Sequence, residues 1–495
     1  MHSATPSCFV HLTDLALGDL VDIVGGTLRL SAMPPRDGDM TPIERIVTDP
    51  CHVQRGDVYW AMPSDMNSVC STEQCTGKHV DAACEALMRG ASGVVSNHRV
   101  EPFAGRWAIE VADPLVALWE LARWRRDRFC GSVIAVCGDD RDTATAMIDC
   151  VLGSRLAGTA PITSRASRAA SNSASNVDDR VATPLSLLAI DATDDYALVQ
   201  ISADSAARAE ATALLCRPRI AVVASADESA GAARQTLSHL STAGFAVLCG
   251  DDAAVRRMAS ATAATVRTFG RRRDCDVSAA NVEYRDGHLR FDVDGVTIRT
   301  RVWGRHHLHA ALAAYAVGRI LEFSPHEIAA ALAAFVPPPG RCDVTQADGL
   351  TIINDPPPPS KNSLVGLELL RETAARGRRF VICGEENADA HENVASSPQN
   401  RTHRNFGEYV VSRAGADRLV AFGREAGEIV HRAREAGMPL AHAVACPTLN
   451  DAANYVEQES QAGDVLLFQG ARSEAIDKIF NRHSEQQHAP TRRAA

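Results

Sequence analysis

Residues 132–152 read S-V-I-A-V-C-G-D-D-R-D-T-A-T-A-M-I-D-C-V-L, and this stretch decides the fold. The apolar run at 133–137 predicts a buried strand, which passes through a tight turn into a helix that begins near Thr143. A strand, a loop and a helix in this order are typical of a phosphate-binding P-loop. The loop departs from that motif, because Arg141, Asp142 and Thr143 stand where a P-loop has a glycine, a lysine and a hydroxyl.

The acidic character of this loop leaves two interpretations open. Asp139, Asp140 and Asp142 would bring three carboxylates against a polyanion, and one misplaced charge in a partly buried site costs on the order of several kcal/mol. The loop is therefore either a former phosphate cradle or a solvated acidic turn that caps the following helix.

Bulk composition is that of an ordinary soluble protein with a large core. The 495 residues suggest about three domains, and 45% of them are hydrophobic. A formal net charge of −10 argues against a nucleic-acid or anionic-membrane surface. Because no apolar run is long enough to span a bilayer and the N-terminus lacks the blocks of a signal peptide, we expect a cytoplasmic protein without a membrane span.

Lysine and cysteine usage narrows the possible chemistry. Lys78, Lys361 and Lys478 are the only lysines, so none lies between residues 79 and 360. The 14 cysteines are scattered without a C-x-x-C pair, which favours free thiols over metal ligands. The histidines of R-H-H-L-H at 305–309 could bind zinc, but hydrogen bonding at a helix start is the favoured interpretation. No metal site is predicted.

Strands and helices alternate through most of the chain, which predicts an α/β protein. In the first hundred residues we expect a helix and turn at 15–28, two strands within 43–62, a helix at 80–89 and a strand at 91–95. A helix at 113–128 leads to the opening strand. Further strands at 196–201 and 220–225, with a helix at 206–216 between them, predict a mostly parallel sheet.

The pattern changes after residue 280. Residues 281–302 alternate polar and apolar side chains around two Asp-Gly turns, which predicts an antiparallel meander. Helices follow at 307–321 and 325–335, and V-P-P-P-G-R at 336–341 marks a domain boundary. The α/β rhythm then resumes, with strands at 351–353, 380–383, 418–422 and 465–468 and a polar loop at 385–404.

Several short motifs, taken in order, resemble the Mur ligases, and within that family the members that add D-alanyl-D-alanine to UDP-muramoyl-tripeptide in peptidoglycan synthesis. Besides residues 132–152, they are D-P-C-H-V-Q-R-G-D-V-Y-W-A-M (49–62), A-T-P-L-S-L-L (182–188), W-G-R-H-H-L-H-A-A-L-A-A (303–314), P-P-G-R (338–341), I-I-N-D (352–355) and G-D-V-L-L-F-Q-G-A-R (463–472). The resemblance implies a three-domain Mur ligase architecture. It comprises a UDP-precursor-binding-like domain at 1–105, an ATPase-like domain with a P-loop-type mostly parallel sheet at 106–336, a Rossmann-like ligase domain at 337–485, and a tail at 486–495.

In that family ATP phosphorylates a carboxyl group with the help of magnesium, and an amine then attacks the acyl phosphate. At the family's nucleotide and metal positions this chain has Gly138, Arg141, Asp142, Thr143, Gln200 and His307. Gly138 and Thr143 match the pattern. Arg141 and Asp142 replace the P-loop glycine and lysine, Gln200 replaces a magnesium-binding glutamate, and His307 replaces an asparagine expected at adenine. The carbamylated lysine of the family cannot exist here, since the region has no lysine.

The resemblance also identifies residual positions in the other two domains. Arg341, Asp355 and Arg472 persist at catalytic positions of the third domain, where four prolines at 356–359 replace much of a substrate loop. These prolines form either a rigid connector, the favoured interpretation, or a polyproline docking surface. In the first domain Pro50 and Cys51 replace the Ser-Arg expected after Asp49.

These departures predict a catalytically degenerate pseudoenzyme with a binding or scaffolding role. Its expected partners are a UDP-muramoyl-peptide-like small molecule and cell-wall synthesis proteins, not nucleic acid. The resemblance implies ATP and magnesium as cofactors, while the residues at their sites favour neither. Two alternatives stay open: an active ATP-dependent peptide ligase in which Arg141 supplies the missing cation, and a sensor that binds UDP-sugar through the first domain alone.

Overall fold

The structure is a computed structural model. It describes residues 9–12, 14–33, 35, 37–62, 82–138, 141–156, 179–191, 194–201, 205–226, 229–285, 287–337, 342–355, 364–384 and 399–470. Some predicted features lie outside these ranges, namely Asp139, Asp140, Arg341, Arg472, the prolines at 356–359 and the tail. Within the described residues, no helix is both long and apolar enough to cross a membrane.

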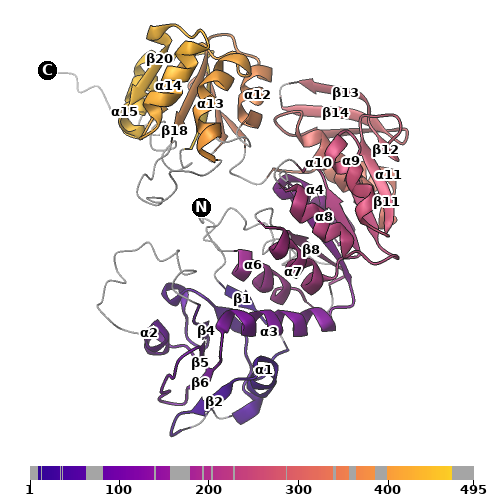
Figure 1. The fold of residues 1–495 in the computed structure, drawn as a ribbon, viewed down its shortest axis with the longest axis vertical. Helices are drawn as coiled ribbons and strands as arrows, with labels where there is room; N and C mark the ends of the chain where they lie inside the picture. Colours follow the sequence, from indigo (N-terminus) through magenta and orange to yellow (C-terminus); the bar gives the residue numbers. More distant parts are fainter. Residues whose placement is uncertain are drawn as a thin grey trace, which may run out of the picture. The chain divides into compact units, whose positions relative to one another are not determined.

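The chain forms two compact units (Figure 1). The first comprises Met1–Ala280, Val293–Val296 and His309–Leu332, and the second comprises Asn281–Asp292, Thr297–Leu308 and Ala333–Ala495. Two six-stranded sheets belong to the first unit and one to the second. The division into three domains at residues 105 and 336 stays a prediction.

The N-terminal sheet of the first unit is mixed. Its strand order is β1 (Phe9–His11), β3 (Arg45–Val47), β4 (Val58–Trp60), β5 (Gly93–Ser96), β6 (Trp107–Glu110) and β2 (Thr27–Leu30). The four inner strands are parallel, while β1 and β2 pair antiparallel at the edges. Two helices accompany this sheet, α1 (Leu17–Val24) and α2 (Ala82–Arg89). All the elements predicted for this part of the chain are present.

Helix α3 (Pro114–Arg128) links the N-terminal sheet to the central sheet. Asp113 caps it by accepting hydrogen bonds from the N–H groups of Leu115 and Val116, as expected for an aspartate before a helix that starts with proline. One hydrophobic core continues from the N-terminal sheet past α3 to the central sheet. Helix α6 (Asp179–Leu188), which the sequence pattern does not predict, packs on α3.

The central sheet is entirely parallel, so the predicted parallel sheet is confirmed. Its order is β12 (Val277–Ser278), β11 (Thr265–Gly270), β10 (Phe245–Cys249), β9 (Ile220–Val223), β7 (Ser132–Cys137) and β8 (Tyr196–Gln200). The accompanying helices are α4 (Arg141–Leu156), α7 (Ala206–Cys216), α8 (Ala230–Ser238) and α9 (Ala253–Arg257).

Helix α4 begins at Arg141, so the predicted start near Thr143 is two residues late. Asp142 consequently lies inside the first turn, where a carboxylate is favoured by the positive end of the helix dipole.

The predicted meander after residue 280 is a three-stranded sheet of β13 (Ala280–Arg285), β14 (His288–Val293) and β15 (Val296–Arg301). Asp294 and Gly295, with φ of +48° and +76°, form the two-residue turn between β14 and β15, as an Asp-Gly hairpin requires. Helices α10 (His307–Ile320) and α11 (Pro325–Ala333) follow, and Ser324 and Glu327 cap α11 reciprocally.

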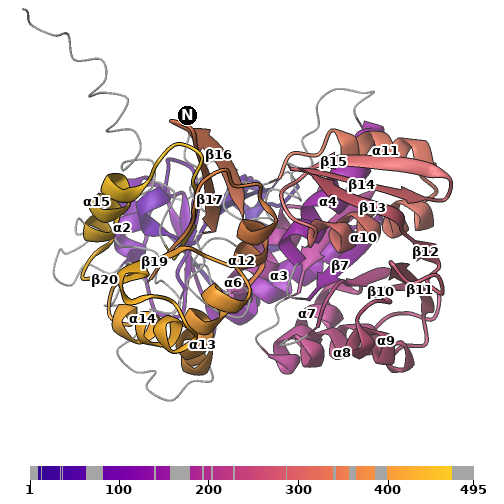
Figure 2. The same ribbon diagram turned by 90° about the horizontal axis from the view of Figure 1, so that it is seen from above.

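The sheet of the second unit has the order β16 (Asp343–Ala347), β17 (Leu350–Asp355), β21 (Val465–Gln469), β18 (Arg379–Gly384), β19 (Arg418–Phe422) and β20 (Ala443–Cys446). All of its strand pairs are parallel except β16 with β17. Helices α12 (Leu364–Glu372), α13 (Gln399–Ser412) and α14 (Ala426–Glu435) cover one face and α15 (Leu449–Glu459) the other (Figures 1 and 2). This is the layered arrangement expected of a Rossmann-like domain.

Helix α13 corrects one prediction in this unit. Residues 399–404 are helical, although the sequence predicts a polar loop through residue 404. The first residues of α13 are polar and give no helical pattern in the sequence. The later turns of the same helix bury Phe406 and Val410 in the core, and this packing stabilises the whole helix.

Candidate functional site

The candidate site lies at the carboxyl edge of the central sheet. Because every strand there is parallel, the residues that follow β7, β8, β9, β10 and β11 meet along one edge. Open α/β sheets bind their ligands at this edge. The structure therefore brings Gly138, after β7, and Gln200, the last residue of β8, to the same side of the sheet.

Gly138, directly after β7, adopts a backbone conformation that favours glycine. Its φ is +111°, in the region that favours glycine, and a Cβ at this position would lie 2.4 Å from the backbone oxygen of Ser225 after β9. A larger residue would both strain the backbone and collide with that oxygen. The family glycine thus has a local structural role here that does not require a nucleotide.

The first turn of α4 carries a carboxylate, Asp142, next to the cation Arg141. Arg141, Asp142 and Thr143 are its first three residues, and all three are partly exposed. The N-terminus of a helix attracts anions through its N–H groups and dipole. The Asp142 carboxylate already supplies an anion at this end of the helix, so a second one would meet repulsion.

Gln200 ends β8 directly beside Val136 of β7. Both its amide nitrogen and its amide oxygen are buried, and neither has a hydrogen-bond partner in the described part of the chain. A buried amide without a partner costs about 1–3 kcal/mol. An amide also brings no negative charge to a hard cation such as magnesium.

Asp251 and His309 form an ion pair at the same edge that the sequence pattern does not predict. Nε2 of His309 lies 2.9 Å from a carboxylate oxygen of Asp251. Burial acts to lower the pKa of His309, but contacts with the Cys249 thiol and the Asp251 carboxylate outweigh burial and raise it to about 9. This hydrogen bond joins the start of α10 to the residue two positions after β10, and the choice between helix capping and zinc binding at 305–309 stays a prediction. Asp251 has no sequence signal beyond its place after an apolar run.

His307 belongs to the second unit. Its ring is buried, and burial lowers the pKa to about 4 against the opposing effect of the Trp303 backbone. The imidazole is therefore neutral near pH 7 and supplies no positive charge. Its neighbour His306 lies against it, with ring centroids 3.9 Å apart.

Of the three catalytic positions predicted in the last part of the chain, Asp355 is the one that the structure describes. It ends β17 opposite Gln469 of β21, is 2% exposed, and accepts a hydrogen bond of 3.0 Å from Nε2 of Gln469. The Cα of Gly366 in α12 packs against this pair. Because Arg341 and Arg472 lie outside the described residues, grouping them with Asp355 stays a prediction.

In the N-terminal sheet, the carboxylate of Asp49 forms its polar contacts within the turn that follows it. The carboxylate of Asp49 accepts a hydrogen bond from the N–H of Cys51 and lies 2.9 Å from Nδ1 of His52. It is 7% exposed. The side chain therefore stabilises the local 3-10 turn at Pro50–His52.

The comparisons with known proteins agree with the resemblance that the sequence motifs indicate. No protein-family model matches the sequence. The chain is 23% identical over 419 residues to UDP-N-acetylmuramoyl-tripeptide--D-alanyl-D-alanine ligase of Bacillus subtilis strain 168, covering 80% of this chain and 85% of that protein. It is 28% identical over 245 residues to UDP-N-acetylmuramoyl-L-alanyl-D-glutamate--2,6-diaminopimelate ligase of Geobacillus kaustophilus, covering 48% of each.

The fold agrees with these sequence relatives. The solved structure of UDP-N-acetylmuramoylalanyl-D-glutamyl-2,6-diaminopimelate--D-alanyl-D-alanyl ligase from Acinetobacter baumannii superposes with a TM-score of 0.72 at 19% identity, and the match covers 98% of this chain and 100% of that one. The multi-domain α/β fold is thus that of a Mur ligase along nearly its whole length. In sequence over four fifths of its residues, and in fold along nearly its whole length, the chain is similar to the Mur ligases.

Proposed function

We propose that this chain is a catalytically degenerate Mur ligase, which acts in peptidoglycan precursor metabolism by binding or scaffolding. The observation that carries the proposal is Asp142 in the first turn of α4, at the helix end where a phosphate group would have to lie. Two like charges about 4 Å apart near a protein surface repel by about 4 kcal/mol. Asp142 therefore opposes the polyphosphate that a lysine at this place would attract.

Outside α4, the other family positions for nucleotide and metal offer no compensating cation. Gln200 is uncharged, and there is no lysine between residues 79 and 360. Among the described residues, no three His, Cys, Asp or Glu side chains are grouped closely enough to hold a metal ion. The residues at the nucleotide and metal positions therefore do not fit ATP with magnesium.

A retained ligand site in the N-terminal part is the simplest form of the binding role. The B. subtilis relative is named for a UDP-N-acetylmuramoyl-tripeptide substrate, and a UDP-muramoyl-peptide-like molecule is the ligand we propose here. A cell-wall synthesis protein is the corresponding partner for scaffolding. The departures at Pro50 and Cys51 mean that such a ligand would contact this domain differently from its relatives.

Turnover and binding can be separated in one experiment. Purified full-length protein is incubated with ATP, magnesium, UDP-muramoyl-tripeptide and D-alanyl-D-alanine, and phosphate release is followed beside the B. subtilis relative as a positive control. We expect release from the control only, while the UDP-precursor raises the melting temperature of this chain. Sustained phosphate release would overturn the degenerate assignment, and an unchanged melting temperature would overturn the precursor site.

One observation favours a second candidate, an active ligase with an altered nucleotide site. Arg141 is the first residue of α4, with Thr143 two residues later, so a cation and a hydroxyl are both present at the helix start. Calorimetry distinguishes the candidates. Magnesium-dependent ATP binding that is lost in Arg141→Ala, but kept in the exposed α8 variant Arg234→Ala, would favour the active ligase. We expect no heat of ATP binding from the wild-type protein or from either variant.

A further inference from the structure

Six exposed arginines gather around α9 and the loop from β11 to β12 in the first unit. This arginine surface consists of Arg256, Arg257, Arg267, Arg271, Arg272 and Arg273. Residues 251–276 contain only four acidic residues, all aspartates, in a chain whose formal net charge is −10. The surface is therefore a local positive region on an acidic protein.

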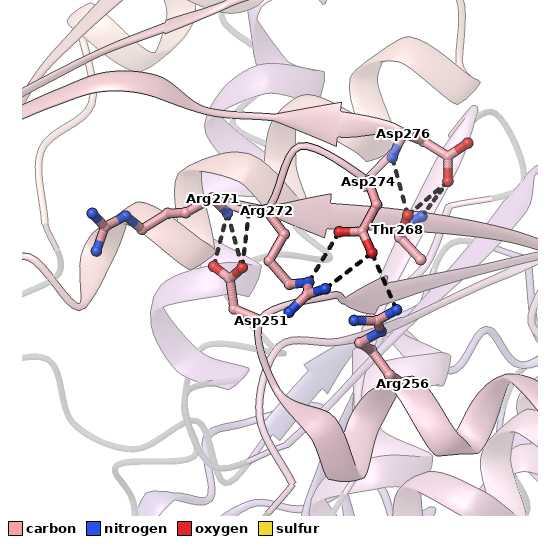
Figure 3. A network of polar contacts seen from close by, with 7 residues as sticks. All are labelled: Asp251, Arg256, Thr268, Arg271, Arg272, Asp274 and Asp276. Carbon is pink, nitrogen blue, oxygen red and sulfur yellow. Dashed lines mark hydrogen bonds and ion pairs between the residues drawn. The ribbon is translucent and has the colours of Figure 1, made fainter.

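Two of these arginines already hold a carboxylate. Nε and Nη2 of Arg272 lie 2.9 Å and 3.2 Å from the two oxygens of Asp274, and Nη2 of Arg256 lies 3.3 Å from one of them (Figure 3). The hydrogen bond from Arg272 lowers the pKa of Asp274, so this carboxylate stays ionised. A planar guanidinium that meets both oxygens of a carboxylate is the geometry by which arginine recognises such groups.

The remaining aspartates of the segment are also engaged within it. Asp276 accepts hydrogen bonds from the N–H and hydroxyl of Thr268 and pairs with Arg267 at 3.3 Å. Asp251 accepts from the N–H groups of Arg271 and Arg272, and Asp252 caps α9. Figure 3 shows the contacts of Asp276 with Thr268 and those of Asp251 with the backbone of Arg271 and Arg272. The aspartates thus leave part of the arginine charge unbalanced.

Arg257, Arg271 and Arg273 carry that unbalanced charge. In the part of the chain that the structure describes, none of their guanidinium groups forms a hydrogen bond or an ion pair. In Figure 3 the Arg271 side chain extends away from the network, while its backbone N–H faces Asp251. Arg257 follows Arg256 in α9, and Arg271 and Arg273 flank Arg272 in the loop after β11, so these three arginines belong to the same two segments as the pair that holds Asp274.

We propose that the arginine surface docks an acidic segment of a partner protein, with carboxylates of the partner on Arg257, Arg271 and Arg273. The Arg256–Asp274–Arg272 arrangement shows that arginines here hold a carboxylate between them. A protein segment fits better than nucleic acid, because an extended polyanion would run onto the acidic remainder of the chain. The proposal goes beyond the degenerate ligase site and stands whether or not the protein hydrolyses ATP.

A fluorescent octaglutamate peptide is a direct probe of this surface. Its binding to the full chain is measured by fluorescence anisotropy, without ATP or UDP-precursor, at low and at physiological ionic strength. The triple variant Arg257→Gln, Arg271→Gln, Arg273→Gln should bind about tenfold more weakly at low salt, since three charge pairs at about 0.5 kcal/mol each amount to one factor of ten. Wild-type affinity should fall as salt increases.

A matched control removes the same charge from the second unit. Arg285→Gln, Arg299→Gln, Arg301→Gln changes three exposed arginines of β13 and β15 and should leave peptide binding within about twofold of wild type. Equal loss in both triple variants would mean nonspecific attraction and overturn the proposal. No peptide binding, or tighter binding of single-stranded DNA of equal charge, would overturn it as well. Melting curves confirm that each variant is folded.

Discussion

Nε2 of His309, near the start of α10, lies 2.9 Å from a carboxylate oxygen of Asp251, which follows β10. Asp251 also accepts hydrogen bonds from the N–H groups of Arg271 and Arg272 after β11. One carboxylate therefore ties a helix start and the ends of two strands together at the carboxyl edge of the central sheet. The pair makes part of the stability of this edge depend on pH.

We expect His309→Gln to lower the free energy of unfolding by about 1 kcal/mol near pH 6 and by much less near pH 10. The pKa of His309 in the folded protein is about 9, above the ordinary 6.5. The ion pair with Asp251 therefore stabilises the folded protein fully below pH 6.5, and this stabilisation is lost as the pH rises through about 9. The expected energy is small because 36% of the histidine side chain is exposed. Urea denaturation across this pH range measures the difference.

His326→Gln serves as the matched control for this pH series. His326 is exposed in α11 and takes part in no ion pair in the described part of the chain. The control should follow wild type at every pH. A pH-independent cost of His309→Gln would show that the ring contributes packing and not charge.

Gln200→Leu should leave stability unchanged or raise it by up to about 1 kcal/mol, because it removes a buried amide that has no partner among the described residues. Gln200→Glu should destabilise the protein, and more so at pH 8 than at pH 5, since a buried carboxylate without a partner must either ionise at a cost or take up a proton. Chemical denaturation of the ligand-free protein measures both. Gln458→Leu, on an exposed position of α15, is the control. A clear loss of stability in Gln200→Leu would mean that the amide is hydrogen-bonded in the folded protein.

Gly366→Ala should cost about 1–3 kcal/mol. A Cβ on this residue would lie 2.8 Å from Nε2 of Gln469 and 2.9 Å from Oδ2 of Asp355, so the methyl group would press on a buried hydrogen bond. Gly427 in α14 has no atom within 4 Å of the same position. Gly427→Ala should therefore stabilise by up to about 1 kcal/mol through helix propensity alone. Thermal denaturation that ranks the two variants in the opposite order would contradict the packing around Asp355.

Gly138→Ala should be more damaging than a change at an open glycine with positive φ. At Gly138 a φ of +111° and the Ser225 oxygen at 2.4 Å act together, whereas Gly295 has a φ of +76° with nothing within 4 Å. We expect Gly295→Ala to cost about 1–2 kcal/mol and Gly138→Ala to cost at least about 3 kcal/mol. Equilibrium unfolding compares them directly. Equal losses would show that β7 and the Ser225 backbone do not approach as described.

Much of the fold could be predicted because short stretches of sequence indicate many of its strands and turns. Apolar runs identified β7, β8 and β9, and the Asp-Gly pairs identified the hairpin after β14. Helix α6 was not predicted, since Pro184 inside it and its small residues weaken the periodic signal. Its stability comes from packing on α3, which no local window contains.

The sequence by itself determined which chemical groups are absent from the central edge. No lysine follows Gly138 in the loop, position 200 is a glutamine and not a glutamate, and no lysine lies between residues 79 and 360. Only the tertiary structure decided which side chains meet there. Asp251 and His309 are 58 residues apart, and Asp355 and Gln469 are 114 apart. Residue type is a property of a position, but contact and burial depend on which strands become neighbours, and strand order is set by the packing of the whole sheet.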